Sequence, residues 1–383
     1  MINRMILNET SYFGEGARSA IPDEVKKRGF KKALVVTDKD LMKFEVATKI
    51  TGVLDETGLS YEVFDDIKQN PTVRNVQEGV ELFKKTGADY LISVGGGSSI
   101  DTAKAIGIII SNPEFSDVLS LEGVADTKNK SVPHIAVPTT AGTAAEVTIN
   151  YVITDVENKR KFVCVDVNDI PNVAIIDSEL MASMPKSLAA ATGMDALTHA
   201  IEGYITKGAW NLTDTLALKS IEMIAKNLRL AVEGDMGAKN NMGTAQYVAG
   251  MAFSNVGLGI VHSMAHPLGA FYDTPHGVAN AVLLPYVMEY NADATGEKYK
   301  HIAKAFGLLN ACTMNPADYR AVAVDAVRKL AIDIGIPQRL SEIGVKEEDL
   351  EELAKSAYND VCTGGNPKET SEKEIFDIYR RAL

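Results

Sequence analysis

The pattern of apolar residues changes near the middle of the chain, and this change constrains the fold more than any other feature. Up to about residue 180, short β-branched runs alternate with helical patterns, as in a parallel sheet covered by helices. The predicted strands are residues 5–7, 33–37, 61–64, 90–94, 135–137, 151–154, 161–165 and 173–176. After Pro185, long segments rich in Ala, Leu, Met, Lys and Glu have helical spacing. The sequence therefore predicts an α/β domain over residues 1–184 and an all-α domain over residues 185–383.

Composition narrows the class of protein. The chain is 46% hydrophobic and 23% charged, which is typical of a soluble globular protein. Its net charge of -12 disfavours binding to nucleic acids and to anionic membranes. The opening MINRMILNET has no basic region followed by an apolar one, so we expect a cytoplasmic protein with no membrane partner. Cys164, Cys312 and Cys362 form no CxxC pair, which argues against a disulfide framework and a thiolate zinc site.

A glycine-rich segment follows one predicted strand. The run Leu-Ile-Ser-Val at 91–94 leads into Gly95, Gly96, Gly97 and Ser98, and a helical pattern continues to residue 110. Glycines let backbone N–H groups approach a diphosphate, and the helix directs its positive dipole end at the anion. The segment therefore predicts a dinucleotide site. The alternative is a tight turn in which Ser98 and Asp101 form a capping box for the helix.

Two further segments are candidate cofactor contacts. Asp38 follows the strand at 33–37, where a carboxylate can bind an adenosine ribose and repel a 2′-phosphate, which favours NAD over NADP. Its alternative role is to cap a helix that begins near Lys39. Thr139, Thr140 and Thr143 follow the strand at 135–137, although any of them could instead belong to a polar turn. Because the first strand has no GxGxxG after it, an ordinary Rossmann dehydrogenase is excluded.

Histidines cluster in the second half of the chain. Of six histidines, four lie between residues 195 and 276: His199, His262, His266 and His276. Asp195 and His199 are four residues apart, as are His262 and His266, so each pair projects from one helix face. Each residue alone could be an ordinary hydrogen-bonded core residue, but one cation would satisfy several of these buried polar groups together.

The ligand types indicate the metal and the chemistry. Imidazole and carboxylate ligands without a thiolate suit Fe(II), Zn(II), Co(II) or Ni(II). An ion with an open position would polarise an alcohol or carbonyl oxygen and make hydride transfer to a nicotinamide feasible. The sequence therefore predicts a metal-dependent oxidoreductase. His134 and His301 lie outside the cluster and are expected to be ordinary packing residues.

Four segments carry a resemblance to a known family. GGGSSIDTAKAIG, PTTAGTAAEV, GMDALTHAIEGY and GLGIVHSMAHPLGAFYDTPHG resemble the signature blocks of the iron-dependent, or group III, alcohol dehydrogenases, and the likeness covers essentially the whole chain. The resemblance implies a dehydroquinate synthase-like fold, with the active site in a cleft between a dinucleotide domain and a helical metal domain. It implies NAD as cofactor and a homodimer.

The resemblance also implies roles for individual residues. The metal, Fe(II) with Zn(II) as the alternative, would be bound by Asp195, His199, His262 and His276. His266 matches a histidine near the metal and nicotinamide, for which we hypothesise a proton-relay role. The implied cofactor contacts are Asp38, Gly96, Gly97, Ser98, Thr139, Thr140, Thr143 and Lys161, of which Lys161 rests on the resemblance alone. Asn150, Phe253 and Cys362 match substrate-cleft positions, with ordinary packing or turn roles as the alternative.

The activity implied is reduction of L-lactaldehyde to L-1,2-propanediol, as in fucose and rhamnose breakdown, and the reverse oxidation. The alternatives are a group III enzyme acting on 1,3-propanediol, glycerol or short-chain alcohols, and a dehydroquinate synthase-like lyase. The lyase would need lysine or arginine beside the ligands, and the segments around Asp195 and His262 contain neither. A non-enzymatic scaffold is disfavoured because the ligand set and the glycine loop are intact.

Overall fold

Six parallel strands form the central sheet of the N-terminal half in the computed structural model, which describes residues 2–158 and 160–383. Their order across the sheet is β1-β8-β5-β4-β2-β3. The strands are β1 (Thr10–Phe13), β2 (Lys32–Val36), β3 (Ser60–Phe64), β4 (Tyr90–Gly95), β5 (His134–Pro138) and β8 (Val173–Ile176). All residues of β4, β5 and β8 are buried, because helices cover both faces of a parallel sheet.

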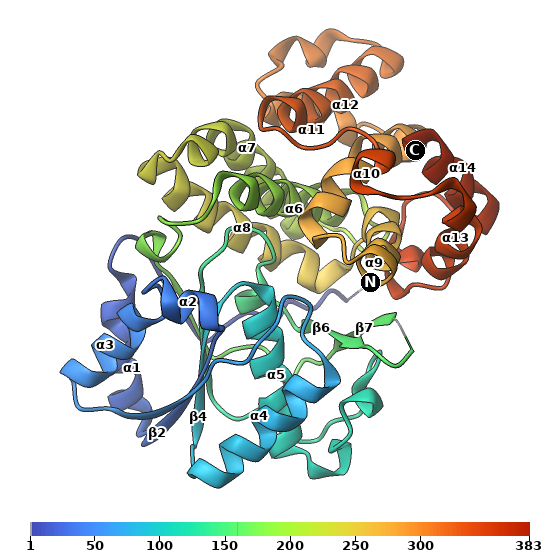
Figure 1. Ribbon diagram of the computed structural model, residues 1–383. Helices are drawn as coiled ribbons and strands as arrows, with labels where there is room; N and C mark the ends of the chain where they lie inside the picture. Colours follow the sequence, from blue (N-terminus) through green and yellow to red (C-terminus); the bar gives the residue numbers. More distant parts are fainter. Residues whose placement is uncertain (1, 159) are drawn as a thin grey trace. The chain divides into compact units, whose positions relative to one another are not determined.

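Helices lie on both faces of this sheet (Figure 1). On one face, α1 (Ile21–Arg28) and α3 (Thr48–Glu56) pack against Val35 and Ile92. On the other face, α4 (Val73–Thr86) and α5 (Gly97–Ser111) pack against side chains that include Leu34 and Leu91. Alternate residues of one strand thus face opposite cores. The predicted α/β class of the first half is confirmed.

Two predicted strands do not belong to the parallel sheet. β6 (Asn150–Asp155) and β7 (Arg160–Val165) form a separate antiparallel pair. In β6 buried and half-buried residues alternate, as expected for a strand with only one covered face. The strand predicted at residues 5–7 is also wrong, because the first strand is β1 and pairing with β8 begins at Thr10.

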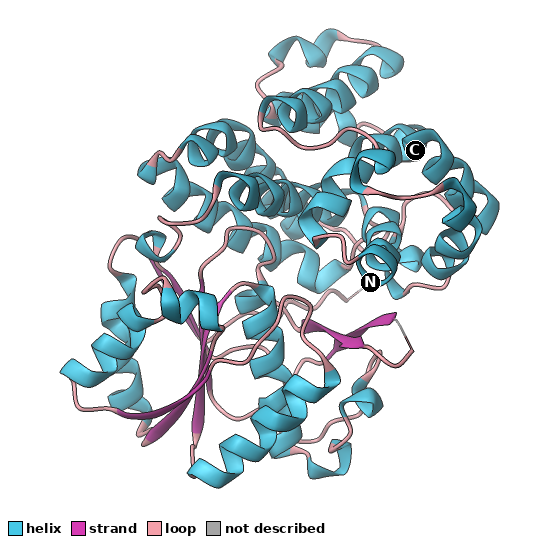
Figure 2. Cartoon of the chain, in the orientation of Figure 1, coloured by secondary structure: helices cyan, strands magenta, loops and turns pink. Residues whose placement is uncertain are grey.

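The second half is built from helices, and Figure 2 shows the contrast with the strand-containing half. The helices are α6 (Lys186–Ile205), α7 (Asn211–Glu233), α8 (Met236–Val256), α9 (Ile260–Tyr272), α10 (His276–Asn291), α11 (Lys298–Ala305), α12 (Pro316–Asp333), α13 (Leu350–Tyr358) and α14 (Glu372–Ala382). α6 is the core helix, since nearly all its residues from Ala189 to Ile205 are buried. Within the described residues no single helix is long and apolar enough to span a membrane, and only α8 with α9, bent by 102°, would pass as a pair.

The chain divides into two compact units. The α/β unit comprises Met1–Thr140 and Ala144–Ser183, and the helical unit comprises Met184–Leu383 together with Ala141–Thr143. The helical unit is therefore discontinuous in sequence. Gly142 shows why these three residues belong to it, because a β-carbon at Gly142 would lie 2.7 Å from the backbone oxygen of Thr192 on α6.

Candidate functional site

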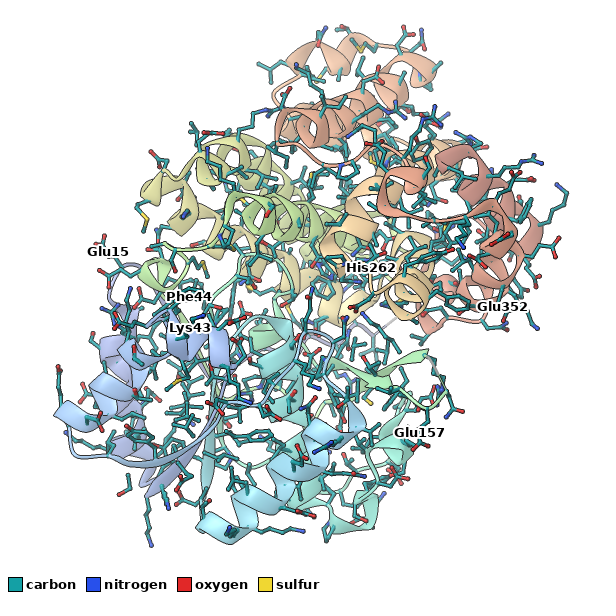
Figure 3. The ribbon with its side chains drawn as sticks, in the orientation of Figure 1. Glu15, Lys43, Phe44, Glu157, His262 and Glu352 are labelled. Atoms are coloured by element: carbon teal, nitrogen blue, oxygen red, sulfur yellow. The ribbon has the colours of Figure 1, made fainter. Side chains whose placement is uncertain are left out.

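Three helices of the helical unit bring the predicted metal ligands together. α6 carries Asp195 and His199, α9 carries His262, and α10 begins at His276. Ligand atoms of Asp195, His262 and His276 all lie within 4.8 Å of one another. Figure 3 shows His262 among the side chains in the interior of this unit. Residues up to 81 positions apart in the sequence thus converge on one point.

His199 lies beside this group rather than within it. Its Nδ1 atom is 3.9 Å from Oδ2 of Asp195, and its ring centre is 4.4 Å from that of His262. The ring of Phe253 stacks on the other side of His199 at 4.2 Å. Nδ1 of His199 is buried without a hydrogen-bond partner in the described part of the chain. A buried nitrogen without a hydrogen-bond partner is unusual in a protein core. It is expected where the side chain binds a metal ion instead.

Burial sets the protonation states of these groups. It lowers the pKa of His199 and holds the pKa of His262 well below its ordinary value, so both rings are neutral with a lone pair to donate. Burial also raises the pKa of Asp195, while His199 and a hydrogen bond from Asn280 lower it. A divalent cation would stabilise the charged carboxylate and satisfy the neutral imidazoles. The side chains present therefore fit such an ion.

A glycine makes the convergence possible. Gly277 is the second residue of α10, and a β-carbon there would lie 2.4 Å from the backbone oxygen of Ala191 on α6. Any other residue would push the first turn of α10 away from α6. The absence of a side chain at Gly277 thus lets His276 approach Asp195, whose Oδ1 lies 3.7 Å from Nε2 of His276.

Sequence reasoning missed Asn280. Its amide nitrogen donates to Oδ1 of Asp195 at 2.7 Å and lies 3.2 and 3.1 Å from Nε2 of His262 and His276. The side chain is fully buried. The signal was available, because Asn280 follows His276 by four residues, the same spacing that pairs Asp195 with His199.

Glu202 was also missed. Its buried carboxylate lies one turn beyond His199 on α6, and Oε2 is 2.6 Å from Nδ1 of His262. Burial raises the pKa of Glu202 to about 7, although hydrogen bonds from backbone N–H groups of the 259–262 segment lower it. A cation beside His262 would favour the ionised form. The spacing from His199 gave a weak signal, since it places Glu202 on the same face of α6.

His266, the predicted proton relay, has a fixed partner. Nδ1 of His266 lies 2.7 Å from Oδ2 of Asp360, and the ring stacks on that of His276 at 5.5 Å. Despite burial, the nearby His266 and its hydrogen bond lower the pKa of Asp360 to about 2. The ionised carboxylate accepts from Nδ1, which leaves Nε2 of His266 to exchange a proton. Asp360 was not predicted.

The three predicted substrate residues do not lie in one unit. Phe253 and Cys362 belong to the helical unit, whereas Asn150 begins β6 in the α/β unit. Burial raises the pKa of the Cys362 thiol well above its ordinary value, with Asp360 contributing. The thiol therefore stays protonated and is not a nucleophile.

The glycine segment lies where ligands bind in open α/β sheets. Because β4 lies on the opposite side of β2 from β3, the strand order reverses between β2 and β4. Gly96 caps α5 without any side-chain hydrogen bond, and Gly97 and Ser98 form its first turn. Thr139 and Thr140 follow the neighbouring strand β5; the Thr139 N–H donates to the Gly95 oxygen at 2.9 Å. These residues surround the free N–H groups of a long helix, which suits a diphosphate.

The remaining cofactor candidates have varied surroundings. The carboxylate of Asp38 accepts from the Leu41 N–H at 2.8 Å, so its alternative role as the cap of α2 (Lys39–Lys43) is confirmed. Lys161 on β7 donates to Oδ1 of Asn70 at 2.8 Å. Thr143 belongs to the helical unit, unlike the other candidates.

The capping box predicted for α5 is wrong. The cap position is occupied by Gly96, two residues before Ser98, so Asp101 is not at the third position of the helix, where the box requires it. The carboxylate of Asp101 instead accepts from the Val152 N–H at 3.0 Å, which ties α5 to β6. The side chain of Ser98 lies in the first turn of α5, where it is available to bind a ligand instead of capping the helix.

Comparisons with known proteins cover the whole chain. Residues 8–178 match the family model described as iron-containing alcohol dehydrogenase, and residues 189–383 match the C-terminal model of the Fe-containing alcohol dehydrogenase family. The chain is 59% identical to lactaldehyde reductase of Escherichia coli over 382 residues, with all of both chains covered. A crystal structure of 1,3-propanediol oxidoreductase is similar with a TM-score of 0.97 and 42% identity, again covering both chains fully. A sulfoacetaldehyde reductase from Bifidobacterium kashiwanohense in complex with NAD+ has a TM-score of 0.88 at 28% identity, covering 100% of this chain and 99% of that one.

Proposed function

We infer the function from one premise: the chain belongs to the iron-containing alcohol dehydrogenase family. The protein is accordingly an NAD-linked, iron-type alcohol dehydrogenase. We propose that it reduces L-lactaldehyde to L-1,2-propanediol with NADH and catalyses the reverse oxidation. The observation that carries the substrate assignment is the 59% identity to lactaldehyde reductase over the full length of both chains.

The proposed metal ligands are Asp195, His199, His262 and His276. Buried neutral imidazoles beside a buried carboxylate suit Fe(II), and the same donors would accept Zn(II). When bound there, the ion would act as a Lewis acid on the substrate oxygen and lower the pKa of the alcohol. The orphaned Nδ1 of His199 supports a fourth ligand in addition to the three clustered residues.

His266 is the proposed proton donor in the reducing direction. Asp360 fixes the ring by accepting from Nδ1, so Nε2 carries out the exchange with the substrate oxygen or with water. The stacking of the His266 ring on that of His276, with ring centres 5.5 Å apart, supports this proposal. The Cys362 thiol, neutral because it is buried, adds no competing charge. Asn150, Phe253 and Cys362 are proposed to contact the substrate.

NAD is proposed to bind at the carboxyl edge of the parallel sheet. Gly96, Gly97 and Ser98 would hold the diphosphate on the first turn of α5, beside Thr139 and Thr140. Asp38, whose Oδ1 caps α2, is also proposed to contact a ribose hydroxyl, which favours NAD over NADP. Thr143 and Lys161 complete the proposed contacts.

An anaerobic NADH-oxidation assay tests the function. The panel comprises L-lactaldehyde, 3-hydroxypropanal, and a long-chain aldehyde, each with Fe(II), Zn(II) or no added metal. We expect the highest kcat/KM with L-lactaldehyde and Fe(II). Faster turnover of 3-hydroxypropanal would favour a 1,3-propanediol dehydrogenase, a role supported by the similar 1,3-propanediol oxidoreductase structure. Equal rates without metal would contradict the metal-dependent scheme.

We also propose a cytoplasmic homodimer acting in the breakdown of fucose and rhamnose. Three free cysteines suit a reducing compartment, and a net charge of -12 suits small substrates better than nucleic acid or anionic membranes. Size-exclusion chromatography with light scattering tests the dimer, which a mass near 41.2 kDa would contradict because that is the mass of one chain.

A further inference from the structure

A carboxylate on one helix reaches the first turn of another. Glu202 projects from α6, and only 2% of its surface is exposed. Oε1 accepts from the Val261 N–H at 2.7 Å, and Oε2 accepts from the His262 N–H at 3.4 Å. The same Oε2 lies 2.6 Å from Nδ1 of His262. One side chain thus contacts both the backbone and the ring of a proposed metal ligand.

The start of α9 depends on this carboxylate. The first N–H groups of a helix have no partner within the helix, and a side chain at the cap position usually satisfies them. Here the cap position is Gly259, which has no side chain to offer. Glu202 supplies the missing acceptor from α6, and its negative charge is favourable at the positive end of the helix dipole.

Gly259 is the counterpart that makes room for Glu202. A β-carbon at Gly259 would lie 2.8 Å from Oε1 of Glu202 and 3.1 Å from Oδ1 of Asn366. The backbone of Gly259 has φ -150° and ψ -158°, which other residues can adopt. The glycine is therefore required by the space that Glu202 occupies and not by its backbone conformation.

The consequence falls on the imidazole of His262. A neutral imidazole carries its proton on one nitrogen, and the partner of that nitrogen decides which one. With Nδ1 donating to Glu202, Nε2 keeps its lone pair, and Nε2 is the atom that faces Asn280 among the clustered ligands. Losing Glu202 would leave both the tautomer and the ring orientation unspecified.

We propose that Glu202 is a positioning residue that fixes the tautomer and orientation of His262 for metal binding. The inference rests on the proposed function, because it takes His262 as a ligand. Partners of this kind contribute about 10–100-fold to metal affinity in other metal sites. Because Glu202 acts through His262, its effect is expected on metal affinity and coordination geometry.

Metal affinity of three variants tests the proposal. Co(II) and Zn(II) dissociation constants are measured by chelator competition on the full-length protein, together with the visible absorption spectrum of the Co(II) form. Glu202→Gln keeps the shape but replaces the charged acceptor, and we expect affinity about 10–100-fold weaker with a changed Co(II) spectrum. Gly259→Ala leaves every polar group intact but displaces the carboxylate, and we expect weakening in the same direction.

Tyr204→Phe is the matched control. Tyr204 lies two residues after Glu202 on α6, is buried, and bonds to Nδ1 of His301 at 2.7 Å, away from the ligands. We expect its loss of the hydroxyl to lower the unfolding temperature without changing metal affinity or the Co(II) spectrum. Thermal unfolding of every variant without metal shows which ones fold.

The possible results distinguish a failure of the proposed metal function from a failure of the role proposed for Glu202. If the unaltered protein binds neither ion with a dissociation constant below the millimolar range, the proposed metal function is wrong. If it binds, but folded Glu202→Gln or Gly259→Ala keeps an affinity within twofold and the same Co(II) spectrum, then Glu202 only stabilises the helix start. If Glu202→Gln does not fold, Gly259→Ala decides the question alone.

Discussion

At the scale of single residues, the site depends on side chains that bind other side chains. Spacing predicted that Asp195 and His199 share one helix face and that His262 and His266 share another, because residues four apart lie on the same side of a helix. The full ligand set of Asp195, His199, His262 and His276 came from the family resemblance and stays a prediction. Asn280, Glu202 and Asp360 were missed because each acts on a residue of a different helix. Spacing from His276 and from His199 gave partial signals for Asn280 and Glu202, whereas the contact of Asp360 with His266 required the packing of α9 against the segment after α13.

Asp360→Asn tests the fixed orientation of His266. Asparagine can still accept from Nδ1 but forms a weaker hydrogen bond than a carboxylate, so the ring is held less firmly and proton exchange should slow. We expect kcat to fall by about 10–100-fold, within the range for general acid–base catalysis, while metal content stays unchanged. Steady-state kinetics and metal analysis measure the two effects. Unchanged kcat would exclude a relay that depends on Asp360.

His134, a buried residue of the α/β unit, provides a prediction about how stability depends on pH. Burial is the main cause that lowers its pKa from 6.5 to about 3, and Lys104 adds to the effect. Between pH 6.5 and 3 the unfolded chain binds a proton that the folded protein does not bind. Stability therefore falls as pH decreases through this window, by up to about 1.4 kcal/mol per pH unit.

Urea unfolding at several pH values measures this contribution. His134→Gln retains a group that can bond to Ser93, the partner of Nε2 at 2.7 Å, but cannot take up a proton. We expect the variant to be less stable at pH 7 and to lose stability less steeply on acidification. Parallel pH profiles of the two proteins would contradict the assignment.

At the scale of helices and strands, the sequence predicted which segments are regular better than how they pair. Buried runs such as Leu91 to Val94 identified β4, because only a strand covered on both faces is apolar throughout. β6 and β7 were recognised as strands but assigned to the wrong sheet. The alternation of buried and half-buried residues in β6 is visible only in the structure, because the sequence Tyr-Val-Ile at 151–153 is apolar throughout.

Two glycine substitutions, one at the contact between α6 and α10 and one on α3, are predicted to have opposite effects on stability. Gly277→Ala would place a methyl group 2.4 Å from the Ala191 oxygen, so we expect weaker metal binding and a lower unfolding temperature. Gly52→Ala in α3 meets nothing within 4 Å and should stabilise the protein by up to about 1 kcal/mol, the difference in helix propensity. Chelator competition and thermal unfolding measure both. Equal metal affinity in the two variants would show that Gly277 does not control the ligand geometry.

At the scale of the whole molecule, the two units are proposed to bind different ligands. Hydrogen exchange should therefore report two separate patterns, since each ligand stabilises the elements that bind it. Fe(II) is expected to protect α6, α9 and the start of α10. NADH is expected to protect the first turn of α5 and the segment after β5. Protection of α5 by the metal alone would contradict this assignment.

The discontinuity of the helical unit has a consequence for exchanging parts between relatives. A chimaera joined only at residue 183 would take Ala141–Thr143 from the parent that supplies the α/β unit. Gly142, however, packs against Thr192, which would come from the parent that supplies the helical unit. A foreign tripeptide with a side chain at that glycine would meet the backbone of α6 a few residues before Asp195. When genes of this family are recombined, the codons for residues 141–143 should therefore come from the same parent as the gene segment for the helical unit.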